Sequence, residues 1–223
     1  MADARSMTIA VLGGTGQEGS GLALRWAHAG HRVILGSRRE DKAAEVARSL
    51  SERVAPAQIR GASNRRAAAE AQIVVLTVPY AAERATVEEV RAELSGKILI
   101  DVTAPLVPPK VSRVQLPPGG SAVEAIQKLL GESTRVVSAF QNVSAHFLFD
   151  LSRDIACDVL VCGDDREARE AAVRLAGDAG LRGVHAGVLA NSAASEALTS
   201  VLIAINRHYK VPAAGIRITG VFE

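Results

Sequence analysis

Short apolar runs alternate along this chain with longer segments in which apolar positions recur at a helical spacing. Each run is too short for a buried helix and suits a central strand of a parallel sheet. The predicted strands are residues 7–12, 32–35, 57–61, 73–77, 97–101 and 135–139. The predicted helices are residues 18–29, 40–53, 63–71 and 82–94, and a capping box at residues 121–124 starts another. This alternation predicts right-handed β-α-β units and an α/β fold.

Residues 102–120 form a long segment that is rich in proline and shows neither a strand nor a helix pattern. A loop of this length inside a compact domain is usually functional or linker-like. The pattern changes again near residues 149–156, where we place a domain boundary. The sequence therefore predicts two domains, residues 1–150 and residues 151–223.

The second predicted domain is small and of the α+β type. Its expected elements are a strand at 158–162, a turn at 163–165, a helix ending at 179, a strand at 183–185, an apolar helix at 192–207 and a tail at 215–220 that can pair as a strand. We expect this domain to complete a substrate pocket on the first domain and to provide a dimer interface.

A glycine motif links the first predicted strand to the first predicted helix. Gly14 and Gly16 follow the strand, and Gly19 is the second residue of the predicted helix. In this context Gly14 allows a tight turn, Gly16 lets the backbone approach a pyrophosphate, and Gly19 lets the helix pack closely on the strand. The helix N-terminus offers free N–H groups to phosphates. The motif predicts a dinucleotide site on a Rossmann-type, doubly wound parallel sheet.

The end of the second predicted strand indicates which dinucleotide binds. An NAD site would place Asp or Glu there, to accept a hydrogen bond from the ribose 2′-hydroxyl. This chain has Ser37, Arg38 and Arg39, with Lys42 one helical turn later. Cations at a helix N-terminus are disfavoured by the helix dipole, so a bound anion explains them better than solvent exposure alone. Arginine and serine are suitable donors to a 2′-phosphate, and we predict NADP(H).

Composition argues against several other classes of function. A net charge of +2 across 223 residues does not favour nucleic-acid binding. An apolar run of the ~18 residues needed to span a membrane is missing, as is a signal-peptide layout, so we expect a cytoplasmic protein without a membrane partner. Cys157 and Cys162 lack further partners for a zinc site, and we predict no metal. Aromatic residues make up 3%, so aliphatic side chains and backbone should line any pocket.

Several of these segments together resemble the NADPH-dependent coenzyme F420 reductases, and the resemblance covers nearly the whole chain. The matching segments are Val-Leu-Gly-Gly-Thr-Gly at 11–16, Gly-Ser-Arg-Arg-Glu at 36–40, Thr-Val-Pro-Tyr at 77–80, Val-Ser-Ala-Phe-Gln-Asn-Val at 137–143, Val-Cys-Gly-Asp-Asp at 161–165 and Ala-Gly-Ile-Arg-Ile at 214–218. The last two are more particular to this family than the first two. Ser144, His146 and Tyr80 depart from the archaeal pattern, and all three border the predicted substrate pocket.

The resemblance implies a role for individual residues. Around the 2′-phosphate it places Thr15, Ser37, Arg38 and Lys42. Along the pyrophosphate it places Gly16, Gln17 and Glu18, and along the path from adenosine to nicotinamide it places Thr77, Val78, Pro79 and Tyr80. Around the deazaflavin it places Val107, Val143, Ala145 and Ala214.

The implied reaction is hydride transfer between the stacked rings of NADP(H) and coenzyme F420, in a homodimer. The cofactors carry this chemistry, so no catalytic side chain is predicted. The acidic tail of F420 would be neutralised by Lys110, Arg113 or Arg207. His146 either packs at the domain junction or protonates a carbonyl substrate.

Two alternatives to F420 reduction stay open. The same hydride donor could serve another acceptor, such as a flavin, an imine or a small ketone. The chain could also be a non-catalytic NADP(H) sensor, which would bind NADPH tightly without oxidising it.

Overall fold

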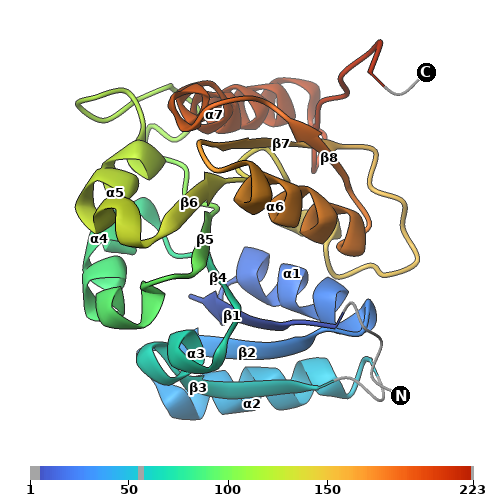
Figure 1. Cartoon of the computed structure of the whole chain (residues 1–223). Helices are drawn as coiled ribbons and strands as arrows, with labels where there is room; N and C mark the ends of the chain where they lie inside the picture. Colours follow the sequence, from blue (N-terminus) through green and yellow to red (C-terminus); the bar gives the residue numbers. More distant parts are fainter. Residues whose placement is uncertain (1–5, 55–57, 222–223) are drawn as a thin grey trace.

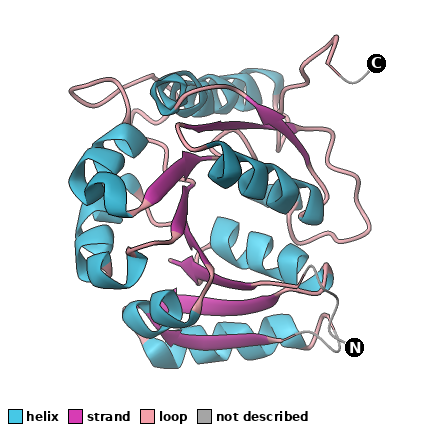
Figure 2. Ribbon diagram, in the orientation of Figure 1, coloured by secondary structure: helices cyan, strands magenta, loops and turns pink. Residues whose placement is uncertain are grey.

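The computed structural model describes residues 6–54 and 58–221, which form one sheet covered by helices on both faces (Figures 1 and 2). The strands are β1 Thr8–Leu12, β2 Arg32–Ser37, β3 Ile59–Ser63, β4 Ile73–Leu76, β5 Ile98–Asp101, β6 Arg135–Ser138, β7 Asp158–Gly163 and β8 Arg182–His185. The helices are α1 Gln17–His28, α2 Glu40–Ser51, α3 Asn64–Glu70, α4 Tyr80–Glu89, α5 Ala122–Leu130, α6 Arg166–Asp178 and α7 Ser192–Tyr209.

The strands lie in the order β3-β2-β1-β4-β5-β6-β7-β8, and β1 to β6 all run parallel. Their side chains alternate between two apolar cores, as the pleat of a strand requires. Along β1, Ile9 and Val11 enter the core beneath α1, α2 and α6, whereas Ala10 and Leu12 enter the core beneath α3, α4 and α5. Burial on both faces explains why the strands are continuous apolar runs, and it confirms the predicted α/β class.

The predicted elements are present with small differences at their ends. The expected helix at 82–94 divides into α4 and a 3₁₀ turn at Arg91–Leu94. The strand expected at 57–61 extends to Ser63, whose hydroxyl then accepts from the Arg66 N–H and caps α3. Residue 57 itself lies outside the described residues. Residues 102–120 contain no helix or strand, as predicted.

The last third of the chain extends the same sheet. β7 pairs antiparallel to β6, and β8 pairs parallel to β7. One core also continues across this join, because the Trp26 indole donates to the Leu175 carbonyl at 2.8 Å and meets the Phe140 ring edge-on at 5.8 Å. The division into residues 1–150 and 151–223, whose ends lie outside the described residues, stays a prediction.

The buried Arg25 holds the connection between these two parts of the chain. Its guanidinium donates to the carbonyls of Leu148 at 2.9 Å, Asp150 at 2.7 Å and Ala179 at 3.0 Å. The planar fork of donors suits several carbonyls at once. The irregular segment before β7 is therefore fixed against α1.

The tail at residues 215–220 does not form the strand that the sequence suggests. Its contacts are instead concentrated on Asp158, the first residue of β7. The Asp158 N–H donates to the Ile216 carbonyl at 2.8 Å, and the Ile218 N–H donates to the Asp158 carboxylate at 2.6 Å. Arg182 hydrogen-bonds the same carboxylate and lowers its pKa. Bonds to Asp158, together with one from the Arg182 guanidinium to the Ile218 carbonyl at 3.2 Å, hold the tail in place without building a ladder.

Among the described residues, no helix combines the length and apolar character needed to cross a membrane.

Candidate functional site

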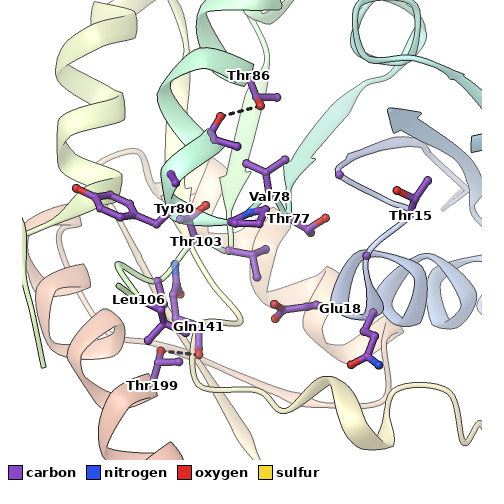
Figure 3. A pocket seen from close by; sticks show the side chains of 18 of the residues that line it. Thr15, Glu18, Thr77, Val78, Tyr80, Thr86, Thr103, Leu106, Gln141 and Thr199 are labelled. Carbon is purple, nitrogen blue, oxygen red and sulfur yellow. Dashed lines mark hydrogen bonds between the residues drawn. The ribbon is translucent and has the colours of Figure 1, made fainter. Parts of the chain in front are cut away.

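A cleft of about 740 Å³ opens at the carboxyl edge of the parallel strands (Figure 3). The loops after β1, β2, β4, β5 and β6 line it, together with one residue of α3 and one of α7. This edge is where strand order reverses between β1 and β4, the position at which doubly wound sheets bind ligands. The volume falls within the range of about 300–1,000 Å³ that is common for small-molecule sites.

The glycine turn shapes one wall of the cleft. The Gly14 N–H donates to the Val11 carbonyl at 3.2 Å and the Gly16 N–H to the Gly13 carbonyl at 2.9 Å, so the chain turns sharply from β1 into α1. A Cβ on Gly14 would lie 2.7 Å from the Val11 oxygen, and one on Gly19 would lie 2.9 Å from the Gly14 Cα. The close approach of α1 to β1 therefore requires glycine at both positions, and it aims the N-terminus of α1 into the cleft.

The cationic end of the cleft lies where β2 meets α2. Ser37, Arg38 and Lys42 all line the cleft there. Arg39 points elsewhere and forms an exposed ion pair with Asp41 at 2.7 Å. The two neighbouring arginines thus differ: Arg38 faces the cleft without an ion pair in the described part of the chain, whereas Arg39 is already paired.

Most of the predicted site residues meet in this cleft. Those that line it are Thr15, Gly16, Gln17, Glu18, Ser37, Arg38, Lys42, Thr77, Val78, Pro79, Tyr80 and Val143. Those that do not line it are Gly14, Arg39, Val107, Ala145 and Ala214. Contact of any of these residues with a ligand stays a prediction.

The residues outside the lining have other surroundings. Gly14 is buried in the turn, and Val107 is exposed beside the lining residues Leu106 and Pro108. Ala145 packs against the core. The Ala214 N–H donates to the Asn206 side chain at 2.7 Å.

The cleft also has residues that the sequence did not single out. Thr103 and Leu106 belong to the proline-rich segment, and Gln141 to the motif at 137–143, so both segments carried a usable signal. Thr199 on α7 carried none. Its hydroxyl donates to the Gln141 carbonyl at 2.8 Å and joins α7 to the cleft (Figure 3). The Gln141 amide donates in turn to the Asp101 carbonyl at 2.8 Å.

Three buried carboxyl groups lie near the lining residues Tyr80 and Thr103. Glu83, Asp101 and Glu196 are 3%, 0% and 1% exposed. Asp101 accepts from the Thr103 N–H at 2.9 Å, and Glu196 accepts from the Ala122 N–H at the start of α5 at 2.8 Å. Burial, with Asp101 next to it, raises the pKa of Glu83 to about 10, and burial raises the pKa of Asp101 to about 6. Neighbouring carboxylates cannot both ionise at low cost, so this pair holds a proton at neutral pH.

We expect the free energy of unfolding to fall as the pH rises from 6 to 9, because the raised folded-state pKa of Glu83 favours the protonated form. The stabilisation that the protonated Glu83 provides is complete below the pKa of this group in the unfolded chain. It is lost as the pH approaches the pKa of this group in the folded protein. The slope should reach roughly 1 kcal/mol per pH unit. Glu83→Gln keeps a donor for Asp101 but has no proton to lose, so urea titrations of this variant should show a shallower slope. Glu88→Gln, on the exposed face of the same helix, should retain the wild-type slope.

The remaining candidate residues lie away from the cleft. His146 is exposed, packs edge-on against Phe147 at 4.8 Å between ring centroids, and lines a separate shallow depression. Cys157 and Cys162 are buried free thiols. Asp165 caps α6 by accepting from the Ala168 N–H at 2.7 Å. Within the described residues, no group of His, Cys, Asp and Glu side chains is arranged to hold a metal ion.

The β3-β2-β1-β4-β5-β6 order, with a glycine turn and a cationic strand end around the crevice, defines a dinucleotide-binding α/β protein. Residues 8–105 match the family model described as NADP oxidoreductase, coenzyme F420-dependent. The F420-dependent NADP reductase of Methanocaldococcus jannaschii is 43% identical over 221 residues, which cover 96% of this chain and 98% of that protein. The chain therefore belongs to the F420-dependent NADP reductase family.

Other relatives agree with this assignment. The F420-dependent NADP reductase of Methanothermobacter marburgensis is 41% identical over 224 residues, which cover 97% of this chain and all of that protein (100%). The crystal structure of a candidate F420-dependent NADP-reductase from Arthrobacter sp. FB24 superimposes with a TM-score of 0.78 at 25% identity, covering 96% of this chain and 100% of that chain. A reductive aminase from Aspergillus terreus shares only the fold, with a TM-score of 0.59 at 17% identity over 92% of this chain and 61% of that chain.

Proposed function

We propose that this protein transfers hydride between NADP(H) and the deazaflavin coenzyme F420, with both bound in the one cleft. The reaction balances as NADPH plus F420 plus a proton giving NADP⁺ plus reduced F420. The observation that carries the proposal is a cleft with cations at one end and a largely uncharged, partly apolar lining at the other, in a chain 41–43% identical to two F420-dependent NADP reductases over nearly its full length.

The cofactor half of the cleft fits NADP(H). Arg38 and Lys42 supply positive charge for a 2′-phosphate, and the Ser37 hydroxyl can donate to it. The N–H groups at the start of α1 suit the diphosphate. Among the described residues, this end of the cleft has no acidic lining residue that could accept a hydrogen bond from a ribose 2′-hydroxyl. Glu40 and Asp41 are close in sequence but do not line the cleft.

The acceptor half fits a second flat ring. Leu106, Val111 and Val143 give it apolar walls, while Gln141 and Thr199 add polar groups. When bound, the two rings would carry the hydride chemistry themselves. The chain's own contribution is to hold the rings face to face and to exclude water, and we extend the proposal to this direct stacking.

The decisive experiment is an acceptor panel with purified protein. NADPH oxidation should be rapid with F420 and at least about 100-fold slower with FMN, cyclic imines or small ketones. Oxidation with another acceptor but not with F420 would assign the cleft to that acceptor. Tight NADPH binding without oxidation by any acceptor would make the protein a sensor.

The acidic tail of F420 calls for cations at the rim of the acceptor half. Lys110 and Arg113 are exposed on the proline-rich loop, and the Arg207 guanidinium donates to the Ser112 hydroxyl at 2.8 Å from α7. We expect Lys110→Ala and Arg113→Ala each to raise the KM for F420 by about 3- to 10-fold and to leave the KM for NADPH unchanged, because a charge-assisted contact is lost. Lys128→Ala on α5 is the control. F420 constants that do not change would exclude these cations.

We also propose a cytoplasmic homodimer whose partners are the two small-molecule redox substrates. Val201, Ile205 and Tyr209 are exposed at helical spacing along α7, which supports pairing through this helix. Sedimentation of the wild type beside Tyr209→Glu tests the dimer, which is excluded if the wild type sediments as a monomer.

A further inference from the structure

Glu18 is an acid inside the candidate cofactor site. It is the second residue of α1, half-buried, and it lines the cleft. Its side chain extends from α1 toward the side where Thr103 and Gln141 lie (Figure 3). Thr15, in the glycine turn, lies on the other side of this helix end (Figure 3).

The charges around Glu18 leave it uncompensated. Besides Glu18, the ionisable side chains that line the cleft are Arg38 and Lys42 from the β2–α2 junction and Tyr80 from α4; the loops after β5 and β6 and Thr199 of α7 contribute none. The carboxyl group of Glu18 has no hydrogen bond or ion pair with any other described residue. Enclosure by the cleft walls raises the pKa of Glu18 to about 8. At neutral pH the group is therefore mostly uncharged, which permits an anionic diphosphate nearby.

A dinucleotide held at the cation end and along the glycine turn must extend its other half across Glu18. The 2′-phosphate is expected at Arg38, and the diphosphate at the start of α1. The nicotinamide would then lie in the part of the cleft lined by Thr77, Thr103 and Gln141, into which Glu18 points. NADP⁺ and NADPH have the same phosphates and differ in one charge, on this ring.

We propose that Glu18 is a specificity-determining residue that distinguishes NADP⁺ from NADPH, because its carboxylate attracts the positive oxidised ring and not the neutral reduced ring. This inference rests on the proposed function, since it requires NADP(H) in the cleft. A charge pair in a partly enclosed site is much stronger than one in water. Ionisation of Glu18 thus stabilises bound NADP⁺ and favours reduction of the acceptor by NADPH.

The direction of the pH dependence follows from linkage. Binding of the oxidised ring lowers the pKa of Glu18 relative to its value with NADPH bound, because an opposite charge favours the ionised form. NADP⁺ affinity therefore increases relative to NADPH affinity as the pH rises through the pKa values of Glu18 in the two complexes. The phosphates oppose ionisation of Glu18 equally in both complexes, and their own titration also cancels in the ratio of the two affinities.

Calorimetric titration with NADP⁺ and with NADPH between pH 6 and 9.5 tests the inference. In the wild type the ratio of Kd for NADP⁺ to Kd for NADPH should fall by about tenfold, the factor that corresponds to one pKa unit between the complexes. In Glu18→Gln the ratio should stay constant and equal the wild-type value at low pH. Glu52→Gln, with the same change at an exposed site after α2, should follow the wild type.

Proton release gives a second measurement that needs no variant. Titrations near pH 8 in two buffers of different ionisation enthalpy should show that the complex with NADP⁺ holds fewer protons than the complex with NADPH, so net proton release is greater, or net uptake smaller, for NADP⁺. A constant wild-type ratio, or the same slope in Glu18→Gln, would overturn the role of Glu18. Failure of either nucleotide to bind would instead reject the proposed function.

Discussion

Replacing Arg38 by alanine is expected to weaken NADPH binding by about 10- to 100-fold and to leave NADH binding within about twofold. Arg38 is the arginine of the 37–39 segment that faces the cleft. Its loss removes charge-assisted hydrogen bonds to a 2′-phosphate, which are worth about 1.5–3 kcal/mol. NADH lacks this phosphate and therefore has little to lose. Fluorescence titration with both nucleotides measures the ratio.

Arg39→Ala is the matched control for this experiment. Arg39 is adjacent in sequence and equally charged, but its guanidinium is paired with Asp41 outside the cleft. Its removal should change the NADPH affinity by no more than about twofold, in line with the small energies of exposed ion pairs. Equal losses in the two variants would mean that general electrostatic attraction, and not a specific phosphate site, sets the preference. A wild type that binds NADH and NADPH equally would refute the NADP assignment.

Gly61→Ala should destabilise the fold by about 3 kcal/mol or more, since overpacking against rigid backbone is difficult to relieve. Gly61 lies in β3, where a Cβ would overlap the backbone of Ala43 and Ala44 on α2 and come within 2.6 Å of the Ala43 oxygen. Thermal unfolding measures the loss. Because α2 carries Lys42, a displaced helix should also weaken NADPH binding.

Gly177→Ala provides the opposite case. Gly177 lies within α6, and nothing lies within 4 Å of its expected Cβ position. Alanine is more favourable than glycine within a helix, by up to about 0.5–1 kcal/mol in the interior and less in the last turn, where Gly177 lies, so this variant should unfold at a slightly higher temperature than the wild type. If both variants lose stability to the same degree, close packing of α2 on β3 is not the cause.

The parallel part of the fold could be predicted because each step depends on nearby residues. Ile9 to Leu12 and Ile73 to Leu76 are continuous apolar runs, as strands buried on both faces must be. The antiparallel pairing of β7 with β6 has no such local signal: the apolar run is the same whichever way the strand lies. The tail at 215–220 has a sequence that can pair as a strand, but its actual partners also lack a local signal. Its β-branched residues fit a strand, but its partners are concentrated on Asp158.

The two halves of the cleft also differ in how far the sequence predicts them. Glycine spacing and Ser37-Arg38 are local motifs, so the structure brings these residues to the cleft as expected. Gln141 and Thr199 meet only because α7 packs beside the loop after β6, a contact between residues far apart in the sequence. Arg25 looks like an ordinary helix cation in the sequence, and only the folded chain shows the carbonyls that it binds.

The reversal after β6 bears on how this family can diversify. Strand ends from β1, β2 and β4 supply one side of the cleft, and they belong to a single continuous β-α-β array. The opposite side draws on the proline-rich loop that joins β5 to α5 and on α7, and α7 lies beyond that array. Mutations can therefore accumulate in the second group and recruit a new hydride acceptor while nucleotide recognition is inherited unchanged.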